Sequence, residues 1–432
     1  MDFTPYLQIL WDLVKDWWWL ALPVVLYKPT VFLWLWWRQE MWINQQRMIV
    51  LEITPPREVV KPIRAMENVF SALWQVHDPP NPREKWFEGK VQMSISLEIV
   101  SDGGKVHFYI RCPEGNRNLI ESSLYSEYPS IEIAEVEDYI KQVPPDIPNK
   151  EWDLWGTNYK LQKPDPYPIK TYKYFFEESE GSKEEERVDP LSNLVEGLSH
   201  FRKGEKLWLQ IVITPILNSE RNYVAEGKAI VDKLVKRPDP KKGPTVFSDL
   251  EAVSAHLATG IPKTQMAEEV REFIPPEMKL TPGERLTVAA IEEKVGKYAF
   301  HAVPRFIYLA PRDNYYSPSK AIAMSYFSQM STADLNGFGP LRPTLTKVHT
   351  ILTWFLDRRR VYIRKRRLLR NYVRRLPPFF PVNTLKGTIL LNIEELATMF
   401  HFPGQIVAPG AGWPRVETKK GGAPRELPME EE

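Results

Sequence analysis

The sequence predicts an α+β fold: an N-terminal membrane anchor, tandem ferredoxin-like (βαββαβ) domains, the second with a helical insertion, and then a basic helix. Three observations predict it. Residues 17–37 form an apolar run rich in Trp. From residue 48, strand-like alternation and helical spacing follow one another in the order of a split βαβ unit. Residues 358–375 hold ten Arg and Lys and no acidic residue.

Residues 17–37 have the length and composition of a membrane-spanning segment. The run contains 21 residues with one charge, Lys28, and about 20 apolar residues suffice to cross a hydrocarbon core. Trp favours the headgroup level of a bilayer, and two groups of Trp flank the aliphatic centre of this run. We therefore assign residues 1–47 to a membrane anchor. Its predicted interfacial residues are Trp17, Trp18, Trp19, Trp34, Trp36 and Trp37.

The path and orientation of this anchor follow from its flanks. A cleaved signal peptide is disfavoured, because the N-terminus is acidic and no small-residue cleavage site follows the run. Pro23, Lys28 and Pro29 leave two paths open, a single-pass span and a re-entrant or interfacial anchor. The Arg-rich flank after the run predicts a cytoplasmic C-terminal body on the inner (cytoplasmic) membrane. The single cysteine, Cys112, agrees with a reducing compartment.

Residues 48–143 are predicted to form the first ferredoxin-like domain. An apolar strand at 48–53 ends at two prolines, and residues 63–76 place apolar side chains at helical spacing. Alternating strands at 91–100 and 106–111 are joined by an Asp-Gly-Gly turn. A second helical stripe around 119–125 and a strand at 130–136 complete the unit.

A second copy is predicted at residues 171–343, after a Pro-rich linker at 144–170. Its elements are a strand at 172–176, a helix at 190–201, a strand at 206–213, a mostly helical insertion at 217–296, a strand at 303–309 and a helix at 318–330. Both copies share a strand, a proline and a polar entry into a helix, in FYIRCPEGN and FIYLAPRDN. This similarity indicates a duplication.

Three further units are predicted toward the C-terminus. Apolar residues on one stripe predict a single long helix over 344–376. A strand–helix unit spans 377–403, in which Asn392 caps a helix and Glu395 stands at the capping-box position. The end of the chain, 404–432, is rich in Gly, Pro and charge and is predicted to be flexible.

Motifs that carry catalysis are missing from the chain. It lacks GxxxxGK[ST], GxGxxG, GxSxG, HExxH and CxxC, and no two of its seven His have metal-ligand spacing. We therefore predict a protein that is not an enzyme and holds no cofactor or metal. The 57 basic and 55 acidic residues nearly cancel, so the average charge implies no particular partner.

The basic run is the one charged constellation above background. It can neutralise nucleic-acid phosphates, lie against anionic lipid, or dock an acidic protein face, and the sequence favours none of the three. The predicted phosphate-contacting residues are Arg358, Arg359, Arg360, Arg364, Lys365, Arg366, Arg367, Arg370, Arg374 and Arg375.

Several segments resemble the region before the motor domain in membrane-anchored ATPases of type IV secretion and conjugative DNA transfer, especially those of small-genome bacteria. They include AMENVFSALWQVH, DPLSNLVEGLSHFRKGEKLWLQIVITP and LNIEELATMFHFPG, and the resemblance runs from about residue 37 to about residue 404. In such ATPases these segments lead into a nucleotide-binding domain, whereas this sequence stops at Glu432. ATP hydrolysis is therefore not carried over.

The resemblance implies a non-catalytic, membrane-anchored component of a secretion or conjugation machine. Its expected role is to dock or position a separate ATPase at the cytoplasmic face of the membrane. The alternative is a membrane-tethered nucleic-acid-binding protein that uses the Arg-rich helix 358–375. Expected partners are membrane lipid and separate ATPase or secretion subunits, with DNA and a second copy of the chain as further candidates.

Overall fold

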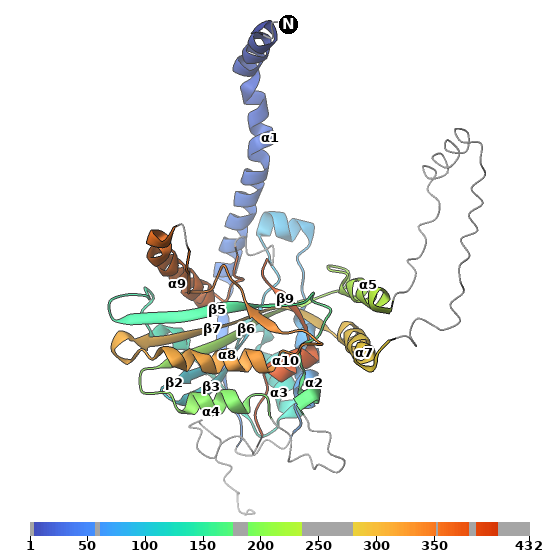
Figure 1. Cartoon of the computed structure of the whole chain (residues 1–432), viewed down its shortest axis with the longest axis vertical. Coiled ribbons are helices and arrows are strands. Elements are labelled where there is room, and N and C mark those ends of the chain that lie inside the picture. Colours follow the sequence, from blue (N-terminus) through green and yellow to red (C-terminus); the bar gives the residue numbers. More distant parts are fainter. Residues whose placement is uncertain are drawn as a thin grey trace, which may run out of the picture.

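The protein has an α+β fold built on one antiparallel sheet. The computed structural model describes residues 4–56, 61–175, 189–235, 280–350, 353–379 and 386–404. Nearly all of the predicted flexible tail lies outside these residues. The sheet has nine strands in the order β4-β1-β3-β2-β6-β7-β5-β8, and β9 pairs with β7. Figure 1 shows α1 extending away from one side of this sheet.

α1 is a single helix of 42 residues, Thr4–Gln45, that runs through Pro23 and Pro29 without a break. Its C-terminal end leads directly into the first strand of the sheet. The two prolines therefore do not divide the Trp-rich run into two segments. Among the described residues, no helix combines the length and the apolar character of a candidate membrane span.

The first half of the sheet has the predicted element order. Strands β1 and β3 pair in the centre, β4 lies beside β1, and β2 lies beside β3. The helices α2 and α3 pack on the same face (Figure 1). The bounds are β1 Met48–Thr54, α2 Arg64–Leu73, β2 Ile95–Asp102, β3 Lys105–Pro113, α3 Arg117–Glu127 and β4 Glu132–Val136.

The second half repeats the order of strands and helices of the first half. The prediction for its first strand needs a correction. Its first strand is β5, Trp152–Leu161, which lies inside the predicted 144–170 linker. The predicted strand at 172–176 is wrong, because Tyr172–Phe175 is a 3-10 turn. The other bounds are α4 Ser192–Ser199, β6 Lys206–Ile216, α5 Tyr223–Val235, α7 Pro282–Gly296, β7 Ala299–Pro311, α8 Lys320–Gln329 and β8 Phe338–Pro340.

The two halves meet edge to edge in the sheet. β2 pairs with β6 from Ile95↔Ile213 to Asp102↔Lys206, so the second strand of one half lies against the second strand of the other. Buried side chains of both halves then share one large hydrophobic core. The halves are therefore joined by a continuous sheet and are not separated by a linker.

Helices cover the two faces of the sheet unequally. On one face, α2, α3, α4, α8 and α10 form a continuous layer (Figure 1). α10, Ile393–Met399, follows β9, Ile389–Asn392, and the predicted capping box between Asn392 and Glu395 is confirmed. The opposite face is covered by α9, Asp357–Val373, and by the short turn Tyr139–Gln142.

The predicted helix over 344–376 begins later than expected, at Asp357. The hydroxyl of Thr346 both accepts from the Gly156 N–H and donates to the Gly156 carbonyl, at 3.0 Å each. The Thr344 hydroxyl likewise accepts from the Asn158 N–H at 3.2 Å. These side-chain bonds to the edge of β5 compete with helical hydrogen bonds. Residues 344–346 therefore follow β5.

Candidate functional site on the α1 side of the sheet

α9 lies on the sheet face from which α1 extends (Figure 1). Leu368, Leu369 and Tyr372 are buried against this face, where they join Trp208 and Leu154 in a second core. Their spacing of one and four residues puts them on one side of the helix. The other side of α9 is left to solvent.

Arg375 lies two residues after the end of α9 and is the most deeply buried of the predicted phosphate-contacting residues. Its guanidinium pairs with Glu98 at 2.9 Å and with Asp138 at 2.7 Å, and its side chain is 2% exposed. The backbone of Arg375 is left-handed, with φ of 53°, a conformation in which Gly is favoured over other residues. The ion pairs of Arg375 therefore offset the cost of a left-handed backbone at a residue other than Gly.

Glu98 lies within a row of polar side chains that crosses the sheet. Burial favours the neutral acid, but the charge and hydrogen bonds of Arg375 outweigh it and lower the pKa of Glu98 to about 2. Gln210 donates to Glu98 at 2.6 Å, and Arg305 donates to Gln210 at 2.6 Å. Burial lowers the pKa of Arg305 to about 10. The residues of this row, in register from β3 to β5, are Tyr109, Glu98, Gln210, Arg305 and Asn158.

Four more of the predicted residues are held by groups of the protein. Lys365 pairs with Asp153 at 2.6 Å. Arg364 donates to the carbonyls of Arg342 and Leu345, and Arg360 donates to Thr353. Arg374 pairs with Glu40 near the end of α1. These contacts fix α9 to β5, to the preceding loop and to α1.

The remaining predicted residues lie on the outer side of α9. Arg366 is exposed and rests over the ring of Tyr362, with its guanidinium 5.7 Å from the ring centroid. Four exposed residues have no ion-pair or hydrogen-bond partner within the part of the chain that the structure describes: Arg358, Arg359, Arg367 and Arg370. Of the ten residues predicted as one site, some are therefore held by contacts within the fold, and the others face solvent.

Exposed apolar side chains accompany these free cations. Trp354 and Phe355, just before α9, are 72% and 65% exposed. Within α9, Tyr362 and Ile363 are 44% and 45% exposed. Large apolar side chains that are exposed beside unpaired cations are typical of a surface that contacts a membrane or another molecule.

A second exposed aromatic pair lies next to α1. Trp86 and Phe87, in the turn Glu84–Glu88, are 39% and 67% exposed. Trp34 donates to the Trp86 carbonyl at 2.9 Å, and Arg38 donates to the Phe87 carbonyl. The turn ends at Gly89, where an added Cβ would lie 2.3 Å from the Arg38 backbone. This close packing fixes the aromatic pair against α1.

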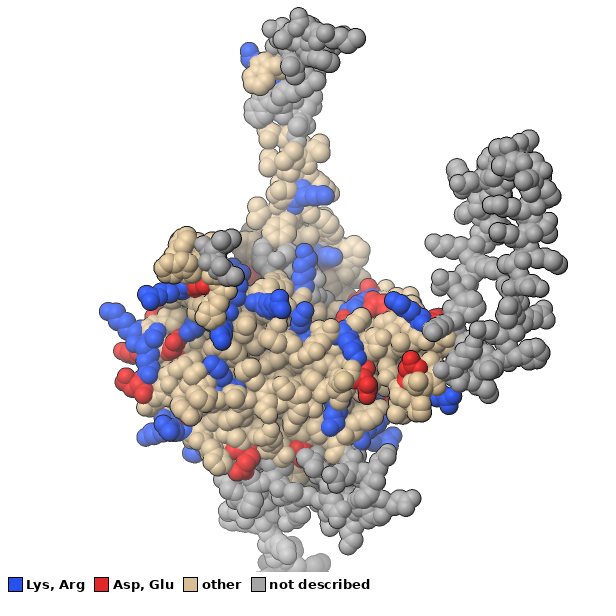
Figure 2. Space-filling view, viewed as in Figure 1, with Lys and Arg blue, Asp and Glu red and all other residues tan. Residues whose placement is uncertain are grey.

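Together these groups define the α1-side surface: Lys85–Phe87, Trp354–Phe355 and the outer side of α9. Figure 2 shows Lys and Arg side chains around the base of α1 and over α9. Of the predicted anchor residues, Trp34, Trp36 and Trp37 are 44%, 41% and 49% exposed. The side chains of Trp17, Trp18 and Trp19 lie outside the described residues.

Sequence reasoning missed the aromatic pairs of this surface. Trp86 and Phe87 stand in a polar, Pro-rich segment without periodicity, PPNPREKWFEGK. Aromatic residues in such a segment have no core to join, and this is the signal that could have identified them. Phe355 was expected on the apolar stripe of the helix predicted over 344–376, but residues 354–356 form a 3-10 turn before α9.

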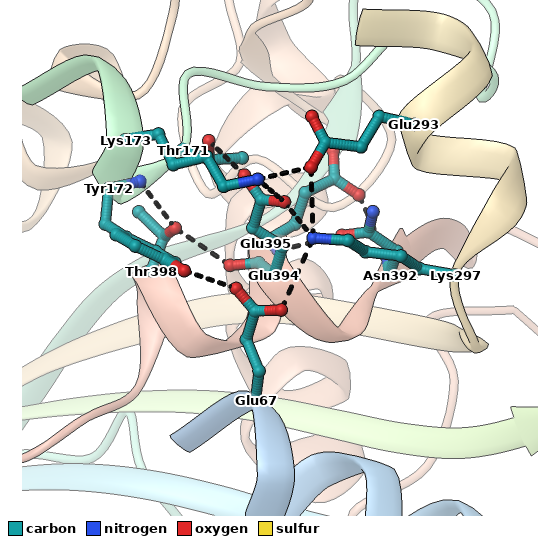
Figure 3. Close-up of polar contacts among 10 residues, drawn as sticks. All are labelled: Glu67, Thr171, Tyr172, Lys173, Glu293, Lys297, Asn392, Glu394, Glu395 and Thr398. Carbon is teal, nitrogen blue, oxygen red and sulfur yellow. Dashed lines mark hydrogen bonds and ion pairs between the residues drawn. The ribbon is translucent and has the colours of Figure 1, made fainter. Parts of the chain in front are cut away.

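A different charged cluster holds the opposite layer together (Figure 3). Lys297 pairs with Glu67 of α2 and with Glu394 of α10, and Lys173 pairs with Glu394 at 2.9 Å. In addition, Lys294 pairs with Glu395 at 3.0 Å, and both side chains are almost fully buried. Thr171 and Tyr172 add hydrogen bonds to Glu394 and Glu67. Each charged group in this cluster has an oppositely charged partner, so we assign the cluster to assembly of α2, α7 and α10.

Among the described residues, no group of three or more His, Cys, Asp and Glu side chains is arranged to hold a metal ion. Cys112 is buried, and burial raises the pKa of its thiol to about 12. The thiol is therefore neutral at physiological pH and a poor nucleophile.

The comparisons with known proteins identify a family without a described activity. No match is found among curated proteins. The family model described as "Domain of unknown function (DUF8128)" matches residues 39–334. The match begins near the end of α1 and includes strands β1 to β7 and the helices through α8, whereas β8, α9, β9 and α10 follow it. It covers more than half of the 432 residues, and the chain therefore belongs to the DUF8128 family.

Proposed function

We propose that this protein is a non-catalytic, membrane-anchored component of a machine like those of type IV secretion and conjugation. In this proposal the body lies at the cytoplasmic face of the inner membrane and positions a separate ATPase. The membrane part of the proposal is supported by one observation: α1 and the α1-side surface lie on the same side of the sheet. The part concerning the ATPase rests on the resemblance of the sequence segments.

The part of α1 before Trp34 has a suitable length for a bilayer. At Trp34 a side-chain hydrogen bond to the Trp86 carbonyl joins α1 to the body. Residues 4–33 are about 30 helical residues, which at ~1.5 Å each extend roughly 45 Å. A bilayer with its headgroups is about 40–45 Å thick. The unbroken helix supports a single pass over a re-entrant path.

The α1-side surface supports contact between the body and the same bilayer. Arg and Lys near an anionic membrane each contribute about 1 kcal/mol, and exposed aromatic residues favour the headgroup level. Arg367 and Arg370 supply the charge, and Trp354 and Phe355 supply the aromatic rings. With α1 in the membrane, these groups face the headgroups.

The topology supports the tandem ferredoxin-like part of the proposal. Each half runs β-α-β-β-α-β and has its fourth strand beside the first and its second beside the third. The helical layer, which lies on the side opposite α1, then faces away from the membrane. We propose this layer as the docking face for the separate ATPase.

Membrane insertion is tested by extraction and labelling of the full chain. After expression in a bacterial host, the protein is expected to stay with the membrane through alkaline carbonate extraction. Thr4→Cys and Arg47→Cys introduce thiols at the two ends of α1, and the buried Cys112 provides an unreactive background. A membrane-impermeant maleimide is expected to label residue 4 from outside and residue 47 only after lysis. Release by carbonate, or equal labelling from one side, would overturn the span.

The partner is tested by co-purification from the source membrane in mild detergent. An ATPase or a secretion subunit recovered in a fixed ratio to the chain supports the proposal. Recovery of the chain with neither, under conditions that preserve other membrane complexes, contradicts it.

Nucleic-acid binding is the second candidate, because the side chains of Arg358, Arg359, Arg367 and Arg370 have no ion-pair or hydrogen-bond partner among the residues that the structure describes. A protein that neutralises Z phosphates shows a log–log salt slope near −0.9Z. Replacing all four by Gln is expected to flatten the slope for duplex DNA by several units if DNA is the ligand. An unchanged slope excludes the outer side of α9 as a DNA site.

A further inference from the structure

A cavity of about 760 Å³ lies at the base of α1, between the helix and the sheet. One wall is Trp36, Gln39 and Ile43 of α1. The floor includes Arg111, Val212 and Val303 of the sheet, and Arg374 and Arg375 lie at the end of α9. Its volume is that of a small-molecule site. A space large enough for a small molecule therefore lies where α1 meets the sheet.

Five Lys and Arg residues line this cavity, Lys85, Lys90, Arg111, Arg374 and Arg375, against two acids, Glu40 and Glu220. Glu40 pairs with Arg374, Glu220 lies 3.2 Å from the ring of His77, and Lys90 pairs with Asp78 and Glu84. Arg375 is matched by Glu98 and Asp138. Two cations of the lining, Lys85 and Arg111, have no hydrogen-bond or ion-pair partner in the described part of the chain.

Arg111 is the more informative of the two, because it is partly buried on a strand in the floor. Burial and the neighbouring charge of Arg375 both lower its pKa. A guanidinium that is removed from water without a partner costs free energy, and a bound anion would offset that cost. Arg also offers paired N–H donors that match phosphate oxygens.

The remaining walls identify the rest of the ligand. Ile43, Met48, Val303 and Val373 make much of the lining apolar. Trp36 lines the cavity and is 41% exposed, and Leu33, one turn earlier on α1, is 55% exposed. The apolar wall thus continues outward along α1. A ligand with a phosphate at one end and an acyl chain at the other fits this gradient.

We infer that this cavity binds the headgroup of an anionic phospholipid, with the phosphate on Arg111 and Lys85 and the acyl chains along α1. The site goes beyond general membrane attachment, because it selects lipids by charge at one position. It rests on the proposed membrane location only for the source of the lipid. A free phosphate compound shares the headgroup chemistry, and the test separates the two.

The test measures ligand binding to the full chain in neutral detergent. Short-chain phosphatidylglycerol is compared with phosphatidylcholine of the same chain length and with glycerol phosphate. We expect phosphatidylglycerol to bind at least tenfold more tightly than either. Equal affinity for the two lipids overturns the headgroup site. Glycerol phosphate binding as tightly as phosphatidylglycerol overturns the lipid assignment.

Variants connect the preference to the cavity. Arg111→Gln is expected to abolish the preference for phosphatidylglycerol, and Arg111→Lys is expected to keep part of it. Arg359→Gln is the matched control, because Arg359 is also unpaired but lies outside the cavity. A preference that survives Arg111→Gln contradicts the inference.

Folding of the variant is checked in the same preparation. Arg111→Gln without lipid is expected to unfold at the wild-type temperature or above it, because it removes an unpaired, partly buried charge. A lower unfolding temperature would mean that Arg111 has a structural partner, and would overturn its assignment as a free anion ligand. Carbonate extraction of the variant is expected to match wild type, so failure of this site is distinct from failure of the anchor.

Discussion

The inner and outer sides of α9 carry the same residue types and differ in what those residues do. On the inner side, Lys365 is paired with Asp153, and Arg375, just after the helix, is almost fully buried between two carboxylates. On the outer side, Arg367 and Arg370 are exposed and unpaired within the described chain. Burial decides the difference, since an unpaired charge is tolerated in water and costly inside the protein. One basic run therefore contains a fold-stabilising group and a group free to bind.

The largest effect is expected from Arg375. Arg375→Leu leaves Glu98 buried without its cation, and removing one partner of a buried pair typically costs about 3–5 kcal/mol. Denaturant unfolding of the full chain measures the loss. Arg370→Leu, on the outer side of α9, is the control and is expected to change stability by less than about 0.5 kcal/mol. Equal losses for both variants would contradict the two-sided description of α9.

Acid should weaken the same pair from the carboxylate side. The pKa of Glu98 is about 2 in the folded protein against an ordinary value of 4.5. As the pH falls, the unfolded chain takes up this proton first, so stability is complete above about pH 4.5 and is lost between about 4.5 and 2. The expected loss is on the order of 3 kcal/mol.

The acid effect is isolated by subtracting the pH profile of Glu98→Gln from that of wild type. The variant is expected to be less stable at neutral pH and to show a flatter acid limb. The contribution of the Glu98 carboxylate is already absent from it, and Gln does not titrate. Parallel acid limbs would show that other carboxylates, and not Glu98, control acid stability.

A smaller effect is expected at Lys365. Its pair with Asp153 has side chains 13% and 19% exposed, whereas Lys141 and Glu137 form a similar pair with side chains 69% and 74% exposed. Lys365→Met is expected to cost about 1 kcal/mol, and Lys141→Met clearly less, because water screens an exposed pair. Unfolding midpoints of the two variants make the comparison. A larger cost at Lys141 would reverse the predicted dependence on burial.

Local signals predicted much of the fold. Alternation and turn residues predicted the element order of the first half, and the spacing of Asn392 and Glu395 predicted the start of α10. β5 was missed because prolines surround it and because Gly156, Thr157 and Asn158 interrupt its apolar pattern. Tyr172–Phe175 alternates like a strand, but its tertiary contacts with α10 hold it as a turn.

The site was less predictable, because its division depends on residues far apart in the sequence. Arg375 and its partner Glu98 are separated by 277 positions. A helical stripe shows which residues share a side, but the side that packs is decided by the sheet it meets. The composition of 358–375 could therefore predict a basic helix, and could not predict which of its cations remain free.

The outer side of α9 should affect stability least and membrane contact most. Arg367→Gln/Arg370→Gln is expected to leave stability within about 0.5 kcal/mol of wild type. Near an anionic bilayer each Arg contributes about 1 kcal/mol, so the pair changes the ratio of docked to undocked body by roughly 30-fold.

An environment-sensitive dye at Phe355→Cys, in full-length protein held in nanodiscs with anionic lipid, reports docking. The dye is expected to shift to the blue in the parent, and less so in the double variant or at high salt. Replacing Lys105 and Lys203, two exposed lysines outside α9, should change nothing. A dye response that ignores Arg367 and Arg370 would mean that the free cations serve a ligand other than the membrane.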